Sequence, residues 1–400
     1  MLNDRRFARQ IAQNGTSTDP GAEVTSIPAW LPYSLYQLRS DGFFLILLVG
    51  WIVLIWVAPL PLLAHASLVD WPTIGALAGL LILTKGIEAS GAVHRTGMWI
   101  ISSMATERAA ALCLVLTAAL LSMLLTNDVA LFVVVPLTLD MCRVTRLPAT
   151  RLIIFQALAV NVGSTLTPIG NPQNLFLWQQ WGISFSQFVL EMSPLVAVLL
   201  VLLVVLTASC FSGRRLQAHG GRAAPALDQR LLGVSLILYV PFLLLTDLDH
   251  PGFAVAAVAL IYLALRPRLL MQIDWGLLLV FMLMFIDLRL FADLGPVREA
   301  IAGLDLAQPR HLYFAGIAAS QFISNVPAAI ALAEYSDHWR VIAFGVAVGG
   351  FGFVIGSLAN LIALRMTDDR HAWISFHAYS LLFLAAAALS GYAVLFWSPI

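Results

Sequence analysis

The sequence is poor in charge. Only 11% of its 400 residues are Asp, Glu, Lys or Arg, and it holds a single lysine, Lys85. Soluble domains carry about 25% charged residues, so a soluble globular fold is excluded. The chain is instead 60% hydrophobic, with apolar blocks such as 43–57 and 193–211. With its flanks, each block approaches the ~20 residues that a helix needs to cross a bilayer. The sequence therefore predicts an all-α polytopic membrane protein of a bacterial-type inner membrane.

Residues that carry enzymatic or metal chemistry are also scarce. Cys113, Cys142 and Cys210 lie in or beside apolar segments without CxxC spacing, which is typical of buried free thiols. No HExxH, phosphate loop, nucleotide fingerprint or catalytic triad occurs in the sequence. We therefore expect no metal or organic cofactor, no nucleic-acid partner and no enzymatic activity. An intramembrane enzyme and ATP-driven transport by this chain alone are disfavoured for the same reason.

Arginine is distributed unevenly among the segments that join the apolar stretches. The loops at 65–71, 178–186 and 248–251 hold no Lys or Arg, whereas the alternate segments are rich in Arg. The loop after residue 295 is mixed, with Arg298 and Arg310. Because basic residues favour the cytoplasmic side, we expect a cytoplasmic N-terminus and an external C-terminus. This assignment uses nine full spans, at about 43–64, 72–93, 149–177, 187–211, 231–247, 252–266, 274–295, 338–363 and 374–396.

Two further apolar stretches are interrupted by short polar groups. Residues 108–140 are interrupted at 126–128 (Thr-Asn-Asp), and residues 311–336 at 324–327 (Ser-Asn-Val-Pro). Their arms hold roughly 10–18 residues, so most reach only ~15–27 Å at 1.5 Å per residue. We expect each stretch to turn back inside the membrane as a re-entrant helical hairpin that protein covers. If each stretch instead crossed the membrane twice, every other loop would stay on the side already assigned to it. The arginine distribution therefore does not distinguish these alternatives.

The interrupted stretches belong to an internal repeat. In each half a polar tip precedes a segment in which an Ile-Gly pair is followed, after three residues, by Asn-Leu. This pattern begins at Ile169 in the first half and at Ile355 in the second. One odd span, 231–247, separates the halves, so the second repeat is inverted. Inverted repeats with broken helices near the midplane are typical of secondary transporters. The predicted organisation is a cytoplasmic tail (1–41), a first repeat (42–211), a cytoplasmic loop with a linking span (212–247) and a second repeat (248–400).

A broken helix exposes backbone groups that can bind solutes. Unpaired amides at the start of one half-helix attract anions, and unpaired carbonyls at the end of the other can coordinate sodium. Four asparagine amides can each donate and accept hydrogen bonds, and we expect them to converge in one polar cavity: Asn127, Asn174, Asn325 and Asn360. Alternatively, these residues only kink their helices and bond neighbouring groups. A channel is another possible function, but it would need a continuous polar stripe along the spanning helices.

The tips and breaks resemble those of the ion transporter superfamily, which includes citrate and sodium–dicarboxylate symporters, arsenite permeases and some sodium/proton antiporters. The resemblance covers about residues 43–396, and its most specific motif is TPIGNPQNL at 167–175. It implies a scaffold and a mobile part that move as an elevator, usually in a homodimer, with a small anionic substrate and Na⁺ or H⁺ as coupling ion. The implied substrate-binding residues are Thr126, Asn127, Thr167, Gly170, Asn171, Asn174, Ser324, Asn325, Gly356, Ser357 and Asn360. Helix breaks are expected at Pro168, Pro172 and Pro327.

The chain departs from this pattern at the third position of each tip. The dicarboxylate branch favours a hydroxyl residue there, whereas this chain has Asp128 and Val326. These tips resemble more closely those of arsenite/antimonite efflux permeases and sodium/proton antiporters, which remain the alternative functions. A carboxylate near the bilayer centre is costly, so Asp128 is the ion-coupling candidate, with helix capping as the other interpretation.

Other charged residues within apolar runs have two interpretations each. Lys85 and Glu88 lie three residues apart, close enough to pair on one helix face. The pair either has a role in function or anchors the span at the cytoplasmic boundary of the membrane. The cluster of Asp287, Arg289 and Asp293 has the same two interpretations.

The arginine distribution makes a prediction for residue 220. In a variant whose native cysteines are replaced by alanine, Gly220→Cys should react with a membrane-impermeant thiol reagent only after the cytoplasmic face is opened. Labelling is measured on right-side-out and inverted vesicles. Reaction in intact right-side-out vesicles would contradict the topology.

Overall fold

A computed structural model describes most of the chain from residue 41 onwards. The predicted tail, apart from residues 38 and 41, and residues 217–225 of the predicted cytoplasmic loop lie outside the described residues. The described residues are 38, 41–57, 60–92, 95, 104–145, 147–216, 226–367 and 369–397. Within them the structure is helical, and the β-type pairing is one isolated bridge between Thr106 and Arg215.

The helices follow one another in two sets. The first set is α3 (Gly42–Val57), α4 (Leu62–His65), η2 (Ala66–Leu68), α5 (Trp71–Ala89), α7 (Glu107–Leu124), α8 (Asn127–Thr145), α9 (Ala149–Ser164), α10 (Pro172–Trp181) and α11 (Phe185–Cys210). The second set is α12 (Gln229–Asp247), α13 (Pro251–Leu265), α14 (Pro267–Leu270), α15 (Trp275–Ala292), α16 (Gly295–Ala302), α17 (Pro309–Ile323), α18 (Asn325–Ala333), α19 (Trp339–Gly349), η3 (Val354–Gly356), α20 (Leu358–Arg365) and α21 (Ala372–Trp397).

Polar residues set the starts of several long helices. The side chain just before the helix accepts a hydrogen bond from the backbone amide three residues on, and such an N-cap is worth about 1 kcal/mol. These N-caps are Asp70 (α5), Thr106 (α7), Asn171 (α10), Ser184 (α11), Asp228 (α12) and Asp274 (α15).

The span lengths differ from those expected. Among the described residues, six helices are long and apolar enough to cross a membrane: α5, α7, α11, α12, α15 and α21. The arms of the first hairpin, α7 and α8, have 18 and 19 residues, so at 1.5 Å per residue they reach about 27–29 Å. The expected arm length of roughly 10–18 residues fits α7 and the 15-residue α17, whereas α8 is longer and α18, with 9 residues, is shorter.

The first predicted span is wrong at its end. We expected it to run over 43–64, whereas α3 ends at Val57 and a separate short helix, α4, follows Pro61. The sequence there has prolines at 59 and 61. Proline lacks the amide hydrogen that a continuing helix needs and disfavours a helical residue before it.

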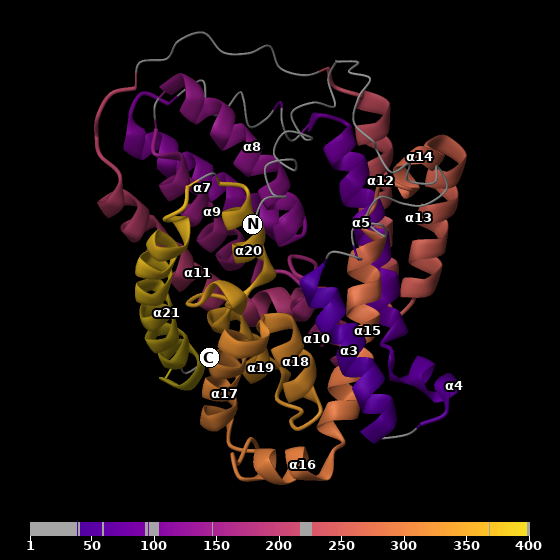
Figure 1. Cartoon of the computed structure of the whole chain (residues 1–400). Coiled ribbons are helices and arrows are strands. Elements are labelled where there is room, and N and C mark those ends of the chain that lie inside the picture. Colours follow the sequence, from indigo (N-terminus) through magenta and orange to yellow (C-terminus); the bar gives the residue numbers. More distant parts are fainter. Residues whose placement is uncertain are drawn as a thin grey trace, which may run out of the picture.

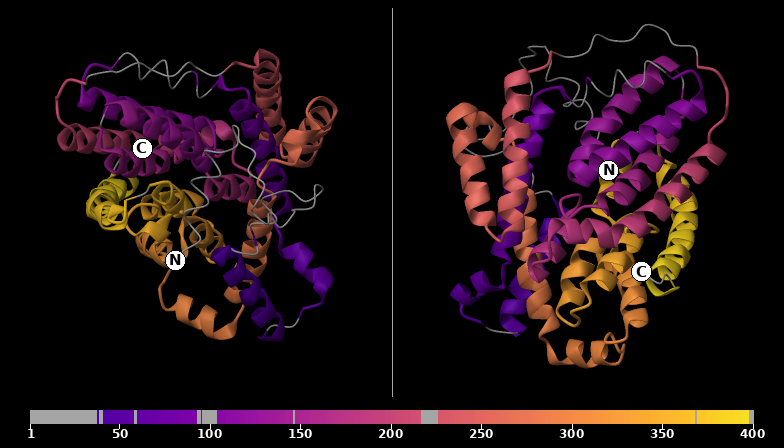
Figure 2. Two further views of the ribbon diagram at one scale, coloured as in Figure 1. Left: turned by 45° about the horizontal axis from the view of Figure 1, so that its top comes forward. Right: turned by 180° about the vertical axis from the view of Figure 1, so that it is seen from behind.

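The helices form two groups (Figures 1 and 2). One, the five-helix group, consists of α3, α5, α12, α13 and α15, which pack on one another. The other, the hairpin group, consists of α7–α11 and α17–α21. Within it α7 packs on α9, α17 on α19, and α21 on α11. The groups meet where α10 contacts α5 and where α18 contacts α15.

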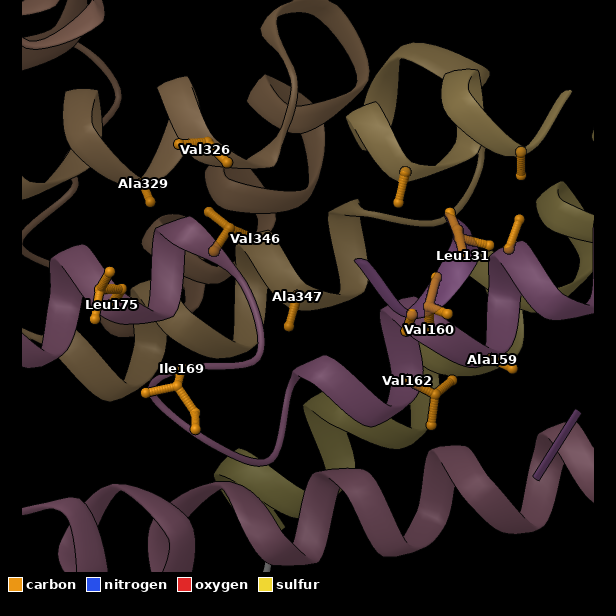
Figure 3. Packing of buried hydrophobic residues seen from close by; sticks show 14 of the residues in the cluster. Leu131, Ala159, Val160, Val162, Ile169, Leu175, Val326, Ala329, Val346 and Ala347 are labelled. Atoms are coloured by element: carbon orange, nitrogen blue, oxygen red, sulfur yellow. The ribbon is translucent and has the colours of Figure 1, made fainter. Parts of the chain in front are cut away.

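Helix α9 lies at the centre of the hairpin group. Every residue from Leu152 to Ser164 is buried, including the polar Gln156 and Asn161. Figure 3 shows the apolar cluster around this helix, with side chains from the first half beside Val326, Ala329, Val346 and Ala347 of the second. Since α9 has neighbours on all sides, its polar side chains must find their hydrogen-bond partners within the protein.

Candidate functional site

Each hairpin turns at a buried polar tip. Thr126 separates α7 from α8, which begins at Asn127, and Ser324 separates α17 from α18, which begins at Asn325. All four side chains are buried. Ser324 has a φ of +74°, a backbone conformation that non-glycine residues seldom adopt, so the second tip is a strained turn.

The first break lies between α9 and α10, and its own asparagines satisfy it. Asn171 caps α10 by accepting from the amide of Asn174 at 2.9 Å. The Nδ2 of Asn174 donates to the carbonyls of Ser164, Thr165 and Thr167, at 3.0, 3.3 and 3.1 Å. Ser164 ends α9 and Thr165 caps it, so their carbonyls have no further turn to bond them, and Thr167 lies in the loop that follows. The amide of Asn174 therefore replaces the missing helical donors.

The second break, between α19 and α20, has a related geometry. Asn360 donates through Nδ2 to the carbonyl of Gly350 at 2.9 Å, ten residues earlier in the chain. Asn174 likewise bonds the carbonyl ten residues before it, that of Ser164. The predicted Gly170 and Gly356 pass close to their own broken helices. An added Cβ would lie 2.4 Å from the carbonyl oxygen of Ser164 and 2.6 Å from that of Gly349.

Each hairpin is joined to the break of its own half. In the first half, the amide of Asn127 donates to the carbonyl of Gly170 at 2.8 Å, and Thr167 Oγ1 donates to the carbonyl of Met123 at 2.7 Å. In the second half, Gln321 Nε2 donates to the carbonyls of Gly349 and Phe351, at 2.7 and 3.0 Å. Tip and break therefore form one polar unit in each half.

The two units face one small cavity. Its volume is about 10 Å³, which is about the space of one water molecule. Both tips and both breaks contribute to its wall, together with the side of α15: Asn127, Asp128, Pro172, Gln173, Leu277, Phe281, Asn325, Val326, Ser357 and Leu358. No Lys or Arg is among these lining residues.

The four predicted asparagines do not all have the same place. Asn127 and Asn325 line the cavity, whereas Asn174 and Asn360 are fully buried behind it and bond the break carbonyls. Thr126, Thr167, Gly170, Asn171, Ser324 and Gly356 are also outside the lining set, as are Pro168 and Pro327. These residues shape the tips and breaks that carry the wall.

Three buried acceptors of the first tip and first break have no hydrogen-bond partner within the described part of the chain. They are Oδ1 of Asp128, Oε1 of Gln173 and Oδ1 of Asn174, and the first two residues line the cavity. Asp128 lies inside the first turn of α8, and the position before the helix, where a cap would be, belongs to Thr126. The cavity thus presents a carboxylate and amide oxygens to any solute that enters it.

The charged residues outside the cavity form separate contacts. Lys85 and Glu88 form an ion pair at 3.2 Å on α5. The expected cluster of Asp287, Arg289 and Asp293 does not pair internally. Arg289 bonds Glu334 at the end of α18 at 3.1 Å, Asp293 bonds Arg298 at 2.6 Å, and Asp287 is buried with Oδ1 unpartnered among the described residues.

Sequence reasoning missed several residues of the site. Gln173 lies between two predicted residues of the TPIGNPQNL motif, and its amide was a recognisable signal. Leu277 and Phe281 are four residues apart on α15 and so share one helix face, but nothing distinguishes them from the lipid-facing leucines of the same helix. Their position in the wall depends on how the two groups pack.

Hairpins and broken helices around a buried polar cavity are features of secondary transporters. Residues 43–349 match the family model described as citrate transporter. The chain therefore belongs to the citrate transporter family, and it is a multi-pass membrane transporter.

The chain is also similar to individual proteins. The chain is 43% identical over 369 residues to inner membrane protein YbiR of Escherichia coli K12, across 92% of this chain and 99% of that protein. It is 32% identical over 133 residues to the silicon efflux transporter LSI3 of Oryza sativa subsp. japonica, which is 33% of this chain and 27% of LSI3. A crystal structure of the YdaH transporter of Alcanivorax borkumensis aligns with a TM-score of 0.49 and 13% identity, over 92% of this chain and 99% of that one.

The geometry of the first break predicts unequal effects for two asparagines. Asn174→Ala removes one donor from three buried carbonyls and leaves that of Thr165 without its side-chain donor, since Asn171 Nδ2 still bonds Ser164 and the amide of Gly170 still bonds Thr167. The substitution should lower the free energy of unfolding by about 1–3 kcal/mol. Asn127→Ala should lower it less, because its Oδ1 accepts only from the neighbouring amide of Asp128. Thermal unfolding of the two purified variants in the same detergent measures the difference. Equal midpoints would show that the Asn174 bonds do not hold the break.

Proposed function

We propose that this transporter carries a small oxygen-rich anion, a di- or tricarboxylate or an inorganic oxyanion, together with a coupling cation, Na⁺ or H⁺. The observation that carries the proposal is the cavity, where both tips and both breaks meet around the carboxylate of Asp128. The amides of Asn127 and Asn325 and the hydroxyl of Ser357 supply donors for substrate oxygens. Membership of the citrate transporter family supports an anionic substrate.

The charge of the cavity requires a coupling ion. No Lys or Arg lines it, whereas Asp128 does. Two like charges about 4 Å apart repel by about 4 kcal/mol at an effective dielectric constant of about 20. An anion can therefore enter only if a proton or a sodium ion offsets Asp128. The unpartnered oxygens of Asp128 and Gln173 are the ligand type that Na⁺ accepts, and a proton on Asp128 would serve the same end.

The size of the cavity requires motion. A space of about 10 Å³ does not hold a carboxylic acid, so the wall must separate for substrate to enter. Leu277 and Phe281 belong to the five-helix group and the rest of the wall to the hairpin group. The inverted repeats then move as an elevator, with the hairpin group as the mobile part, the five-helix group as the scaffold and both hairpins re-entrant.

Few polar contacts join the two groups. Arg289 on α15 pairs with Glu334, and the hydroxyl of Tyr335 donates to the carbonyl of Ala292 at 2.8 Å. At the first hairpin the hydroxyl of Tyr239 on α12 donates to a backbone carbonyl at the end of α7. The carboxylate of Asp247 at the end of α12 also accepts from the amide of Phe185 on α11. A small number of such contacts can be exchanged during a cycle, since a single hydrogen bond contributes only about 1 kcal/mol net.

Efflux of an uncharged polyhydroxy solute such as arsenite or antimonite is the second candidate. The observation that favours it is again the unpartnered acceptors, because a neutral solute with hydroxyl donors can bond them without repulsion from Asp128. The silicon efflux relative supports the same alternative. Sodium/proton exchange is the limiting case, in which the cation is the only cargo.

Thermal shifts of the purified protein distinguish these functions. A solute that binds the folded state stabilises it by RT ln(1 + [L]/Kd), about 2.7 kcal/mol at one hundred times Kd. We expect citrate, succinate or sulfate to raise the unfolding midpoint, and to do so more with Na⁺ or at the lower of two pH values. Stabilisation by arsenite without any anion effect would favour the second candidate. Equal anion effects with and without Na⁺ and at both pH values would contradict coupling.

Replacement of Asp128 tests the coupling site. In proteoliposomes, Asp128→Asn should retain substrate exchange at equal concentrations on the two sides but lose its response to the ion gradient. The neutral amide no longer needs a cation to admit an anion. Asp287→Asn is the matched control, because Asp287 is another buried carboxylate with an unpartnered oxygen but lies outside the cavity wall. A response to the gradient that survives in Asp128→Asn would rule Asp128 out as the coupling site.

A further inference from the structure

One side-chain hydrogen bond joins the first half to the second break. Asn161, near the end of α9, donates through Nδ2 to Oδ1 of Asn360 at 2.8 Å. Both side chains are buried, and neither lines the cavity. Asn161 also donates to the carbonyl of Ala157 in its own helix at 3.1 Å, which holds the amide in this orientation.

The contact continues from Asn360 to the second tip. Asn360 Nδ2 donates to the carbonyl of Gly350, so both ends of its amide are occupied. Gly350 lies close to the tip, since a Cβ added there would be 3.2 Å from Nδ2 of Asn325 and 3.7 Å from Oδ1 of Asn161. A chain of neighbouring residues thus leads from α9 to the cavity wall: Asn161, Asn360, Gly350 and Asn325.

The first half has no equivalent bond. Asn174 and Asn360 are 186 positions apart, as are Gly170 and Gly356, and the same separation pairs Asn161 with Ala347. Alanine has no donor to offer. In agreement with this, Oδ1 of Asn174 is buried without a partner within the described residues, whereas Oδ1 of Asn360 accepts from Asn161. Figure 3 shows Ala347 on α19, and Val160 and Val162 on α9.

We infer that Asn161 is a positioning residue for transport. It holds Asn360, and through Gly350 it fixes the second tip, so that the second-half wall of the cavity keeps one geometry. The first break lacks this constraint and keeps its free acceptors. The inference deepens the proposed function and rests on it. At the same site, the second half supplies a wall of fixed geometry, and the first half supplies acceptors that can adjust to the solute.

A matched pair of substitutions separates positioning from packing. Asn161→Leu keeps the branched outline of the side chain and removes its donor, and its two methyl groups are bulkier than the amide. Gln156→Met likewise replaces a buried amide by a slightly larger apolar group five residues earlier in α9, where Gln156 bonds Thr138 and not a break. Asn161→Ser, which is too short to reach Asn360, is the milder variant to use if the leucine variant does not fold.

Hydrogen–deuterium exchange of the full-length protein in detergent gives the decisive measurement. Loss of one buried hydrogen bond corresponds to about ten-fold in an opening equilibrium. We expect amides 350–358 to exchange about ten-fold faster in Asn161→Leu and at the wild-type rate in Gln156→Met, with amides 165–171 unchanged in both. Wild-type exchange at 350–358 in a folded Asn161→Leu or Asn161→Ser protein would overturn the inference. So would equal acceleration in Gln156→Met.

Citrate binding gives a second measurement. Half-saturation of the citrate thermal shift should rise about ten-fold in Asn161→Leu and stay unchanged in Gln156→Met. Equal half-saturation in wild type and Asn161→Leu would contradict the positioning role. If citrate and the other solutes fail to stabilise even the wild-type protein, the proposed function fails, while the exchange measurement still decides whether Asn161 holds the second break.

Discussion

A helix that stops in an apolar interior leaves backbone carbonyls without water to bond, and in this protein asparagine amides take the place of that water. Asn174 supplies one amide to three carbonyls at the end of α9, and Asn360 supplies one to the carbonyl of Gly350. Each unsatisfied group would cost several kcal/mol in hydrocarbon. The breaks can exist only because these side chains reach back ten residues, and the hairpins in turn dock on the breaks.

This constraint divides the polar residues into two kinds. Those that satisfy the backbone, such as Asn174 and Asn360, lie behind the cavity and have little freedom to bind anything else. Asn127, Asn325 and Ser357, whose side chains do not bond the carbonyls of the breaks, lie on its wall. A site of this construction combines rigid turns with a small set of available donors and acceptors, which is what discrimination between similar solutes requires.

Much of this arrangement could be predicted from the chain because local chemistry determines it. Proline and glycine mark the breaks, and a polar group inside an apolar run marks each tip, so both turns were located, although α8 and α18 begin inside the predicted interruptions 126–128 and 324–327. The role of Asn161 could not be predicted, since its partner is distant in sequence and its own surroundings resemble any buried helix. Leu277 and Phe281 were hidden for the same reason: their place in the wall is set by packing between groups. The length of α8 was underestimated, because the helix continues past the apolar residues that were counted and through Arg143 to Thr145.

The pairing of Asn161 with Asn360 also bears on how the protein is made. The two residues are 199 positions apart. At synthesis rates of about 5–20 residues per second, the amide of Asn161 waits about 10–40 s in the membrane before its partner exists. During that interval α9, which has no lipid-facing side in the finished protein, holds buried polar groups that the bilayer cannot satisfy. Until α20 arrives, the Asn161 amide has the carbonyl of Ala157 in its own helix to bond, so the polar pairing inside the hairpin group is completed only late in synthesis.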